Sequence, residues 1–483
     1  MKKLFSLFLA LCSGIAFLNA LEIEIQNQSV ASSEIVPLWI EANRYGSVLT
    51  DTTLQSHVRS RIRWDSTFFN GNLRWITEGS GSVGFSEAFN PLVTMDTLYT
   101  AFQYGLWEFR GGWFQETLGE VFEPLSSGSM AVSSNARPMP RIEFRLTDWY
   151  ILPWSWTEGL IAIKGGIQHG WFEPNNYVDN VWLHAKWAYL RLGTEQQHIF
   201  GGLVHLAQWG GKGSYNGEDF DIPFTFHNWW QTFVAGGVVE GQAEIEKYNA
   251  SGNHLGIWDL GTKITISGFE LSAYYQHFFE DKASLDIWSN GLDGLFGLHV
   301  KTPSEVPFLR HVLIEKVITT DQSGPQEEIL LTNPDNTTSL VNIYGGDSYY
   351  FNYLYKTGWS YLGRILGTPL ITGTGSGEDF RVNNNRIDAL HIGGLMEAGT
   401  VTIRALYTYT KRFPAYSEQS LVSYTTWAEK LDYRNHKDRW DGYLGISFPL
   451  GPLTILGEFA GGYDQIFGWN WGSAMTVGYR TTF

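Results

Sequence analysis

The last nine residues of the chain place the strongest limit on its fold. Met475, Val477, Tyr479, Thr481 and Phe483 share one face of a period-two strand, and the chain stops on that phenylalanine. An apolar edge strand exposed to water would favour aggregation. The strand is stable where it closes a barrel whose outer face meets lipid, because every backbone edge is then paired. The alternative is a buried last strand in a soluble β-protein.

The first twenty residues favour the barrel. Two lysines precede an apolar run over residues 4–18, and Ala20 is a suitable last residue before cleavage. This is the layout of a secretory signal peptide, which we predict over residues 1–20, and it is too short for a typical membrane span. The one cysteine, Cys12, lies inside it. We therefore expect neither disulfides nor thiolate metal sites in the mature chain.

Composition separates the two ways of crossing a membrane. No stretch after residue 20 approaches the roughly 20 apolar residues that a transmembrane helix needs. The mean hydropathy is −0.16, as in a barrel whose every second residue faces a polar lumen. Aromatic residues make up 16% of the chain, with 21 Trp and 24 Tyr. Such residues form the girdles at membrane interfaces and also the surfaces that bind sugars.

Alternating segments of about ten residues recur along the chain, as in membrane β-barrels. Three of them fold back as hairpins at Gly268, at residues 398–399 and at residues 449–452. Long polar stretches at 280–294, 319–347, 373–386 and 411–440 are predicted to be extracellular loops, where function concentrates. We assign residues 92–483 to the barrel. Residues 21–91 are less regular and are expected to supply a periplasmic or plug element besides the first strands.

The charge of the chain excludes one class of partner. Without residues 1–20 it has 31 basic and 49 acidic residues, a net charge of −18, so no nucleic acid partner is expected. An acidic polysaccharide would need a local basic site. Arg59, Arg61 and Arg63 share one strand face and form a basic ladder in the predicted lumen. They are placed either to bind carboxylates or sulfates of a ligand or to pair with acidic side chains of the lumen.

A set of short motifs gives the chain a specific resemblance. The motifs are residues 37–46 (PLWIEANRYG), 126–129 (SSGS), 135–138 (NARP), 183–186 (LHAK), 189–191 (YLR), 205–211 (HLAQWGG), 252–256 (GNHLG), 276–281 (QHFFED), 293–294 (DG), 322–325 (QSGP), 355–361 (YKTGWSY) and 367–369 (GTP). They occur in order over nearly the whole mature chain. The chain resembles the Wzi capsule assembly family, in the divergent form of Bacteroidetes-like envelopes.

The resemblance implies an all-β outer-membrane barrel of eighteen antiparallel strands with a small helical element and a plugged lumen. It implies a lectin-like activity that holds secreted capsular or other surface polysaccharide at the cell surface, with no cofactor. Outer-membrane lipid and the barrel assembly machinery are the other expected partners, since a last strand ending in an aromatic residue resembles the recognition signal of such barrels. The shared motif residues Asn135, Arg137, Gln208 and Gln322 are expected to organise the lumen and the loop bases.

Sugar rings stack on aromatic faces, and their hydroxyl groups bond to polar side chains. The candidate glycan-binding residues are Trp229, Trp230, Trp288, Trp427, Trp440, Trp469, Trp471, Arg412, Arg434 and Arg439. For each tryptophan, the alternative role is a girdle anchor or loop packing. A long polymer that engages several weak contacts at once is retained by effective concentration.

The lectin is weighed against two other classes of function, a channel and an enzyme. An eighteen-stranded barrel can enclose an aqueous lumen, so a porin or substrate channel is the alternative to the lectin. An enzyme is not expected, because the chain has no G-x-S-x-G elbow, no H-E-x-x-H motif and no thiol nucleophile. The acidic pairs Glu218/Asp219 and Glu378/Asp379 lie in Gly-rich loops, where carboxylates could bind Ca²⁺. We interpret them as solvated surface and expect no metal site.

Overall fold

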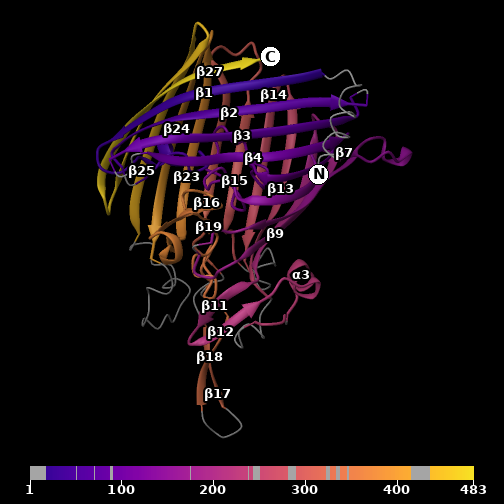
Figure 1. Cartoon of the computed structure of the whole chain (residues 1–483), viewed down its shortest axis with the longest axis vertical. Coiled ribbons are helices and arrows are strands. Elements are labelled where there is room, and N and C mark those ends of the chain that lie inside the picture. Colours follow the sequence, from indigo (N-terminus) through magenta and orange to yellow (C-terminus); the bar gives the residue numbers. More distant parts are fainter. Residues whose placement is uncertain are drawn as a thin grey trace, which may run out of the picture.

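A computed structural model shows a closed antiparallel β-barrel (Figure 1). The structure describes residues 18–50, 52–69, 71–87, 91–174, 176–237, 239–242, 251–280, 290–322, 327–332, 338–344, 347–414 and 436–483. The first wall strand pairs with the second and also with the last, with Glu22 opposite Thr482, so the wall has no free edge. Two short segments lie end to end along one neighbour and occupy one position in the wall. The wall therefore has eighteen strands, which confirms the predicted fold class.

The wall strands in chain order are β1 (Leu18–Ser32), β2 (Leu54–Phe68), β3 (Leu73–Ser86), β4 (Leu92–Tyr104), β5 (Trp107–Trp113), β6 (Pro140–Leu146) with β7 (Tyr150–Ile151), β8 (Ile161–Trp171), β9 (Trp182–Gly193), β10 (His198–Trp209), β13 (Asn253–Ile266), β14 (Phe269–Phe279), β15 (Gly294–Lys301), β16 (Leu309–Ile318), β23 (Arg386–Ala398), β24 (Val401–Phe413), β25 (Lys437–Leu450), β26 (Leu453–Asp464) and β27 (Gly468–Thr482).

The remaining elements belong to the connections between wall strands. The hairpins are β11 (Gly211–Tyr215) with β12 (Glu218–Ile222), β17 (Glu327–Thr332) with β18 (Thr338–Tyr344), β19 (Ser360–Tyr361) with β20 (Arg364–Ile365), and β21 (Thr372–Thr374) with β22 (Arg381–Asn384). The short helices are α2 (Leu38–Glu41), η1 (Ser155–Thr157), α3 (Phe226–Phe233) and η3 (Gly377–Asp379). Among the described residues, none of the helices is long and apolar enough to cross a membrane.

The two ends of the barrel differ in their connections. At one end, here called the turn end, short turns join strands such as β13–β14, β23–β24 and β25–β26, at the three positions that the sequence predicts. At the other, here called the loop end, long connections carry β11, β12, β17 and β18 beyond the wall, while the C-terminus lies at the turn end (Figure 1). The wall itself begins at Leu18, so residues 21–91 contribute β1, β2 and β3 as well as the connection between β1 and β2.

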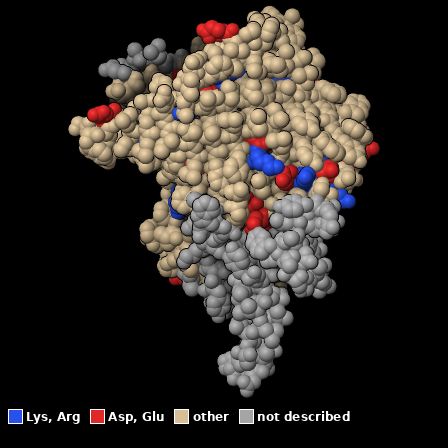
Figure 2. Space-filling view, turned by 180° about the vertical axis from the view of Figure 1, so that it is seen from behind, with Lys and Arg blue, Asp and Glu red and all other residues tan. Residues whose placement is uncertain are grey.

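Alternation along each strand produces the two faces of the wall. On β27, Met475 and Tyr479 are exposed on the outside, whereas Ala474 is buried on the inside. The outer face carries many exposed large apolar side chains, among them Val58, Ile62 and Leu98. Figure 2 shows a wide band of this surface with few charged residues, with basic and acidic groups clustered toward the loop end and further acidic groups at the opposite edge. Such a band is the surface that lipid requires.

Three connections fill the lumen as a plug: residues 33–53, 114–139 and 347–385. They contain most of the largest fully buried side chains, including Trp39, Met130 and Trp359. The indole nitrogen of Trp39 donates to Thr408 of β24 at 3.0 Å, and the Glu120 amide donates to Asp259 of β13 at 2.7 Å. The barrel thus has a packed core of its own, built from its connections.

Candidate functional site at the loop end of the lumen

The basic ladder of β2 lies in the lumen, as the alternation predicts, and its charges are balanced there. The ion pairs are Arg59–Asp96 at 2.8 Å, Arg61–Glu22 at 2.6 Å, Arg61–Glu78 at 2.8 Å and Arg63–Glu78 at 3.3 Å. Of the two interpretations of the ladder, the geometry supports the pairing with lumenal carboxylates. A ligand would have to displace these internal partners.

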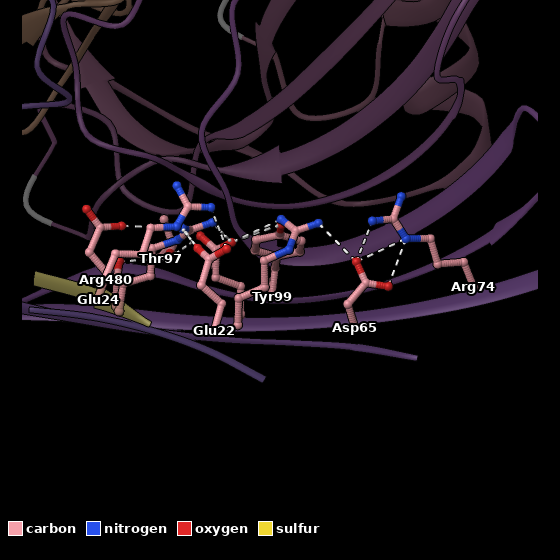
Figure 3. A network of polar contacts seen from close by, with 11 residues as sticks. Glu22, Glu24, Asp65, Arg74, Thr97, Tyr99 and Arg480 are labelled. Carbon is pink, nitrogen blue, oxygen red and sulfur yellow. Dashed lines mark hydrogen bonds and ion pairs between the residues drawn. The ribbon is translucent and has the colours of Figure 1, made fainter. Parts of the chain in front are cut away.

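The same charge network extends toward the turn end. Glu22 contacts both Arg61 of the ladder and Arg480, and Figure 3 shows Glu22 and Arg480 in this network together with Asp65, which faces Arg74. Arg480 pairs with Glu22 at 2.5 Å across the seam between β1 and β27, and Asp65 pairs with Arg74 across β2 and β3. The network joins neighbouring wall strands and closes the seam of the barrel.

Three candidate tryptophans lie on the outer face of the wall. Trp440, Trp469 and Trp471 are on the same strand faces as exposed residues such as Leu444 and Met475. Trp469 and Trp471 are 77% and 55% exposed. Their position outside the barrel corresponds to the girdle role and not to a sugar-binding surface inside the lumen.

Trp440 and Trp469 are part of a continuous aromatic row near the loop end. Ring centroids are 5.6 Å apart for Tyr409–Trp440, 5.6 Å for Trp440–Tyr463 and 5.1 Å for Tyr463–Trp469. We expect the double variant W469A/W471A to lower the temperature at which the folded barrel denatures in vesicles, because interfacial anchors are lost. Binding of polysaccharide should be unchanged, as a pull-down with the folded variant would measure.

The other candidates fall into three groups. Trp229 and Trp230 belong to α3, which packs against the outside of the wall near β9 and β10. Arg412 and Arg439 face the lumen, where they pair with Asp464 at 2.5 Å and Asp441 at 2.7 Å. The remaining candidates, Trp288, Trp427 and Arg434, lie outside the described residues.

The motif residues that the sequence singled out hold the plug in place. The Asn135 amide donates to the Ile365 carbonyl at 3.0 Å, Gln208 to Gly358 at 2.8 Å and Gln322 to Asn385 at 2.9 Å. In each case a side-chain amide joins segments distant in the sequence. The expectation that these three residues organise the lumen and loop bases is confirmed.

The serine-rich motif at residues 126–129 binds a buried carboxylate of the wall. Glu315 of β16 accepts hydrogen bonds from Ser126 Oγ at 2.7 Å, from the Ser127 amide at 2.7 Å and from Ser127 Oγ at 2.6 Å. Tyr274 donates a fourth hydrogen bond. Glu315 is fully buried, so this carboxylate fastens the plug to the wall at one point.

Arg137 departs from the expected structural role. Within the described part of the chain it forms neither a hydrogen bond nor an ion pair, although it is half-buried. Its side chain lines two adjoining cavities at the loop end. The outer of these, here called the recess, is lined by Ser47, Leu49, Gln55, Ser56, His57, Ser82, Gly84, Phe85, Leu92, Thr94 and Arg137.

The surroundings of Arg137 favour an anion. Burial lowers the pKa of its guanidinium, and the nearby positive charges of Arg364 and Arg59 add to this shift, whereas Asp96 opposes it. Asp96 is already paired with Arg59. An incoming anion would therefore relieve the repulsion among like charges as well as pair with Arg137.

Gly46 allows two arginines to approach the same turn. It has a φ of +61°, and a Cβ at this position would lie 2.7 Å from Cγ of Arg137 and 3.5 Å from Cδ of Arg364. Arg364 donates to the Val48 carbonyl at 2.7 Å, so its position is fixed. The rim of the recess is fixed as well, because the Gln55 side chain both accepts from the Leu49 amide and donates to its carbonyl. The recess is thus preorganised, and it contains Arg137 as a cation without a partner in the described part of the chain.

No signal in the sequence distinguishes Arg137 from its motif neighbours, since its lack of a partner depends on contacts among three separate connections. Among the described residues, no group of three or more His, Cys, Asp or Glu side chains is placed to hold a metal ion.

Comparison with known proteins places this architecture in a family. The sequence profile of the family "Capsule assembly protein Wzi" matches residues 51–315, more than half of the chain. The solved structure of Escherichia coli Wzi, described as an outer membrane protein involved in group 1 capsule assembly and a carbohydrate-binding β-barrel, superposes with a TM-score of 0.58. That alignment covers 94% of this chain and 83% of that chain at 14% identity.

Two Pseudomonas aeruginosa proteins are more distantly similar. OccK5 and OprD superpose with a TM-score of 0.47 at 8% identity, and each alignment covers 96% of this chain and 98% or 96% of the other. No curated protein sequence matches the chain. The eighteen-stranded wall, its apolar outer band and the family profile lead to one conclusion: the chain belongs to the capsule assembly protein Wzi family and resides in the bacterial outer membrane.

Proposed function

We propose that this protein binds surface polysaccharide at the outer membrane and holds it there during capsule assembly, as a lectin-like protein and not as an enzyme. Membership of the Wzi family supports this proposal, as does the carbohydrate binding described for the E. coli protein. The observation that carries it is Arg137, a guanidinium that has no partner among the described residues and lies in a preorganised recess at the loop end of the lumen.

The chemistry of the recess suits the carboxylate of an acidic sugar unit. A guanidinium donates two parallel hydrogen bonds to a carboxylate, which gives both strength and orientation. The lining residues Ser47, Gln55 and Thr94 supply polar groups of the kind that bond to sugar hydroxyls. The strongly negative chain would repel an acidic polymer elsewhere, so a local cation decides where such a polymer is held.

The packed lumen supports retention over the alternative of a porin or substrate channel. A channel needs a continuous aqueous path, whereas three connections bury large side chains inside this barrel. They are fastened to β13, β16 and β24 by the hydrogen bonds described above. A polymer held at several weak sites along the loop end would be retained through effective concentration.

Deletion of the gene tests the proposal in the cell. We expect polysaccharide to move from the cell-bound fraction to the medium while its total amount stays constant, because synthesis does not depend on retention. Complementation with the intact gene should restore the bound fraction. An unchanged ratio of bound to shed polysaccharide would contradict the proposal, whereas a fall in total polysaccharide would point to a role in synthesis or export.

We also propose that the barrel assembly machinery recognises β27 during insertion. Phe483 and Leu21 exchange two backbone hydrogen bonds, at 2.9 and 3.2 Å, and the Phe483 ring is 73% exposed on the outer face. The variant Phe483→Ser should lower the amount of folded barrel in the membrane, measured by heat-modifiable migration. Cell-bound polysaccharide should fall in proportion to the folded barrel. A normal barrel level would contradict recognition through this residue.

A further inference from the structure

One patch of the outer wall is polar where lipid contact would require apolar side chains. It lies at the loop end of β8, β9, β10 and β13. The lumenal side of these strands is identified by Tyr189 of β9, whose hydroxyl donates to Asp259 at 2.9 Å beside the plug. Along each strand, the residues that alternate with these lumen-facing positions therefore point outward. The outward residues at the loop end are His169, Trp171, Trp182, His184, Lys186, His205, Trp209 and His254.

The burial of this patch changes sharply along the strands. Toward the turn end the outward side chains Leu190, Leu192 and Ile199 are 45%, 43% and 57% exposed, as expected for lipid contact. Toward the loop end His184 and His205 are 1% and 7% exposed. A segment of the chain must therefore cover the wall from outside.

The cover is the segment that contains α3. The Phe233 ring lies 5.3 Å from the His184 ring, and the Lys186 ammonium lies 4.0 Å from the centre of the Phe233 ring. Lys186 also donates a hydrogen bond to the Phe233 carbonyl. Ahead of the helix, Phe224 packs on Trp182 with ring centroids 4.6 Å apart. The helix and the residue two positions before it thus shield both the cation and the imidazoles.

The segment is internally fixed. Thr225 caps the helix by accepting from the Asn228 amide at 3.1 Å. The fully buried Asn228 side chain donates to the Pro223 carbonyl at 3.0 Å and accepts from the Glu240 amide at 3.1 Å. One side chain therefore ties the two ends of the segment together, and the cover is a folded unit.

The other side of the helix carries an apolar stripe that faces away from the protein. Phe226, Trp230 and Val234 follow each other at intervals of four residues and are 75%, 46% and 47% exposed. Residues four apart share one face of a helix. The helix lies at the loop end near β9 (Figure 1). The stripe is therefore on the same outward side of the barrel as the lipid-facing residues of β9 and β10.

We propose that residues 223–237, with residues 239–242 tied to them, form an interfacial element whose stripe inserts into the outer leaflet of the membrane. Exposing a lysine and several histidines to lipid would be costly, most of all near the bilayer midplane. The segment removes that cost by covering the patch and extends the apolar belt with aromatic side chains of its own. Amphipathic helices at the boundary of headgroups and acyl chains bury their apolar face to a depth of about 5–10 Å.

Spin labels can locate the stripe relative to lipid. In a Cys12→Ser background, single cysteines are introduced by Phe226→Cys on the stripe, by Ile199→Cys on the lipid-facing wall and by Asp219→Cys on the exposed β12 hairpin. Each labelled protein is reconstituted into vesicles of phosphatidylethanolamine and phosphatidylglycerol, and heat-modifiable migration verifies the fold. Collisions with oxygen, which concentrates in lipid, are compared with collisions with a water-soluble nickel chelate.

We expect the label at position 226 to resemble the label at 199, with frequent oxygen collisions and few nickel collisions. A label at 226 that behaves like the label at 219 would place the stripe in water and overturn the proposal. A label shielded from both reagents would also overturn it, because the stripe would then be covered by a second copy of the chain. The result does not depend on polysaccharide binding.

Discussion

The variant Arg137→Gln is expected to bind polysaccharide of its own strain about 10- to 100-fold more weakly than the native protein. A hydrogen bond to a charged group contributes about 1.5–3 kcal/mol, and each 1.4 kcal/mol corresponds to about a factor of ten in affinity. The loss is expected to be large because Arg137 has no internal partner in the described structure to re-pair with. Arg137→Lys should retain part of the affinity, since an ammonium preserves the charge but not the paired geometry.

The ligand offers a matched control for this variant. Reducing the carboxylates of the polysaccharide to alcohols should weaken binding to the native protein and have little further effect on Arg137→Gln. Arg480→Gln, at the turn end, should bind normally. If Arg137→Gln and the native protein lost equal affinity on carboxylate reduction, Arg137 would not be the group that meets the acidic sugar.

The variant Glu315→Ala is expected to convert the plugged barrel into a conducting one. It leaves the serine donors of the plug and the Tyr274 hydroxyl buried without their acceptor. Leaving a buried donor without its acceptor costs about 1–3 kcal/mol, so several such donors together raise the population of the undocked plug by about two orders of magnitude or more. The native protein should show little conductance in a planar bilayer, and the variant should show frequent openings.

A second carboxylate controls for charge. Glu397, exposed near the turn end, pairs with Arg310 at 2.8 Å, and Glu397→Ala should stay as closed as the native barrel. Unchanged heat-modifiable migration of Glu315→Ala would show that the wall is intact. High conductance of the native protein would contradict the plug and favour the porin alternative, and a closed Glu315→Ala barrel would show that this carboxylate does not hold the plug.

The wall could be predicted from the sequence because its strands and turns depend on residues that are close together in the chain. Alternation with a period of two records the inner and outer faces residue by residue, and turn residues mark where strands reverse. The hairpin at Gly268 is an example, since Leu271 and Ala273 continue outward while Ser272 faces the lumen. The plug lacks such a period. Its contacts join residues hundreds of positions apart, as between Arg44 and Glu458, and no local pattern encodes them.

The same alternation predicts on which face of the wall the candidate tryptophans lie. Trp440 has the parity of Leu444 and Phe448, and Trp471 has the parity of Met475, all of which face outward. The outward position of these tryptophans was therefore readable from the sequence. Arg137 was not, because being unpaired is a property of the assembled plug. The outward position of α3 also depends on tertiary contacts, since its own sequence shows an amphipathic helix but not the wall that it covers.

The proposal that the protein retains surface polysaccharide is tested most directly by binding of the purified, folded protein to polysaccharide from its own source strain. Empty detergent micelles and a foreign neutral polysaccharide serve as controls. We predict saturable binding to the strain's own polysaccharide that neither control reproduces. The absence of binding by a barrel shown to be folded would contradict retention as the function of this protein.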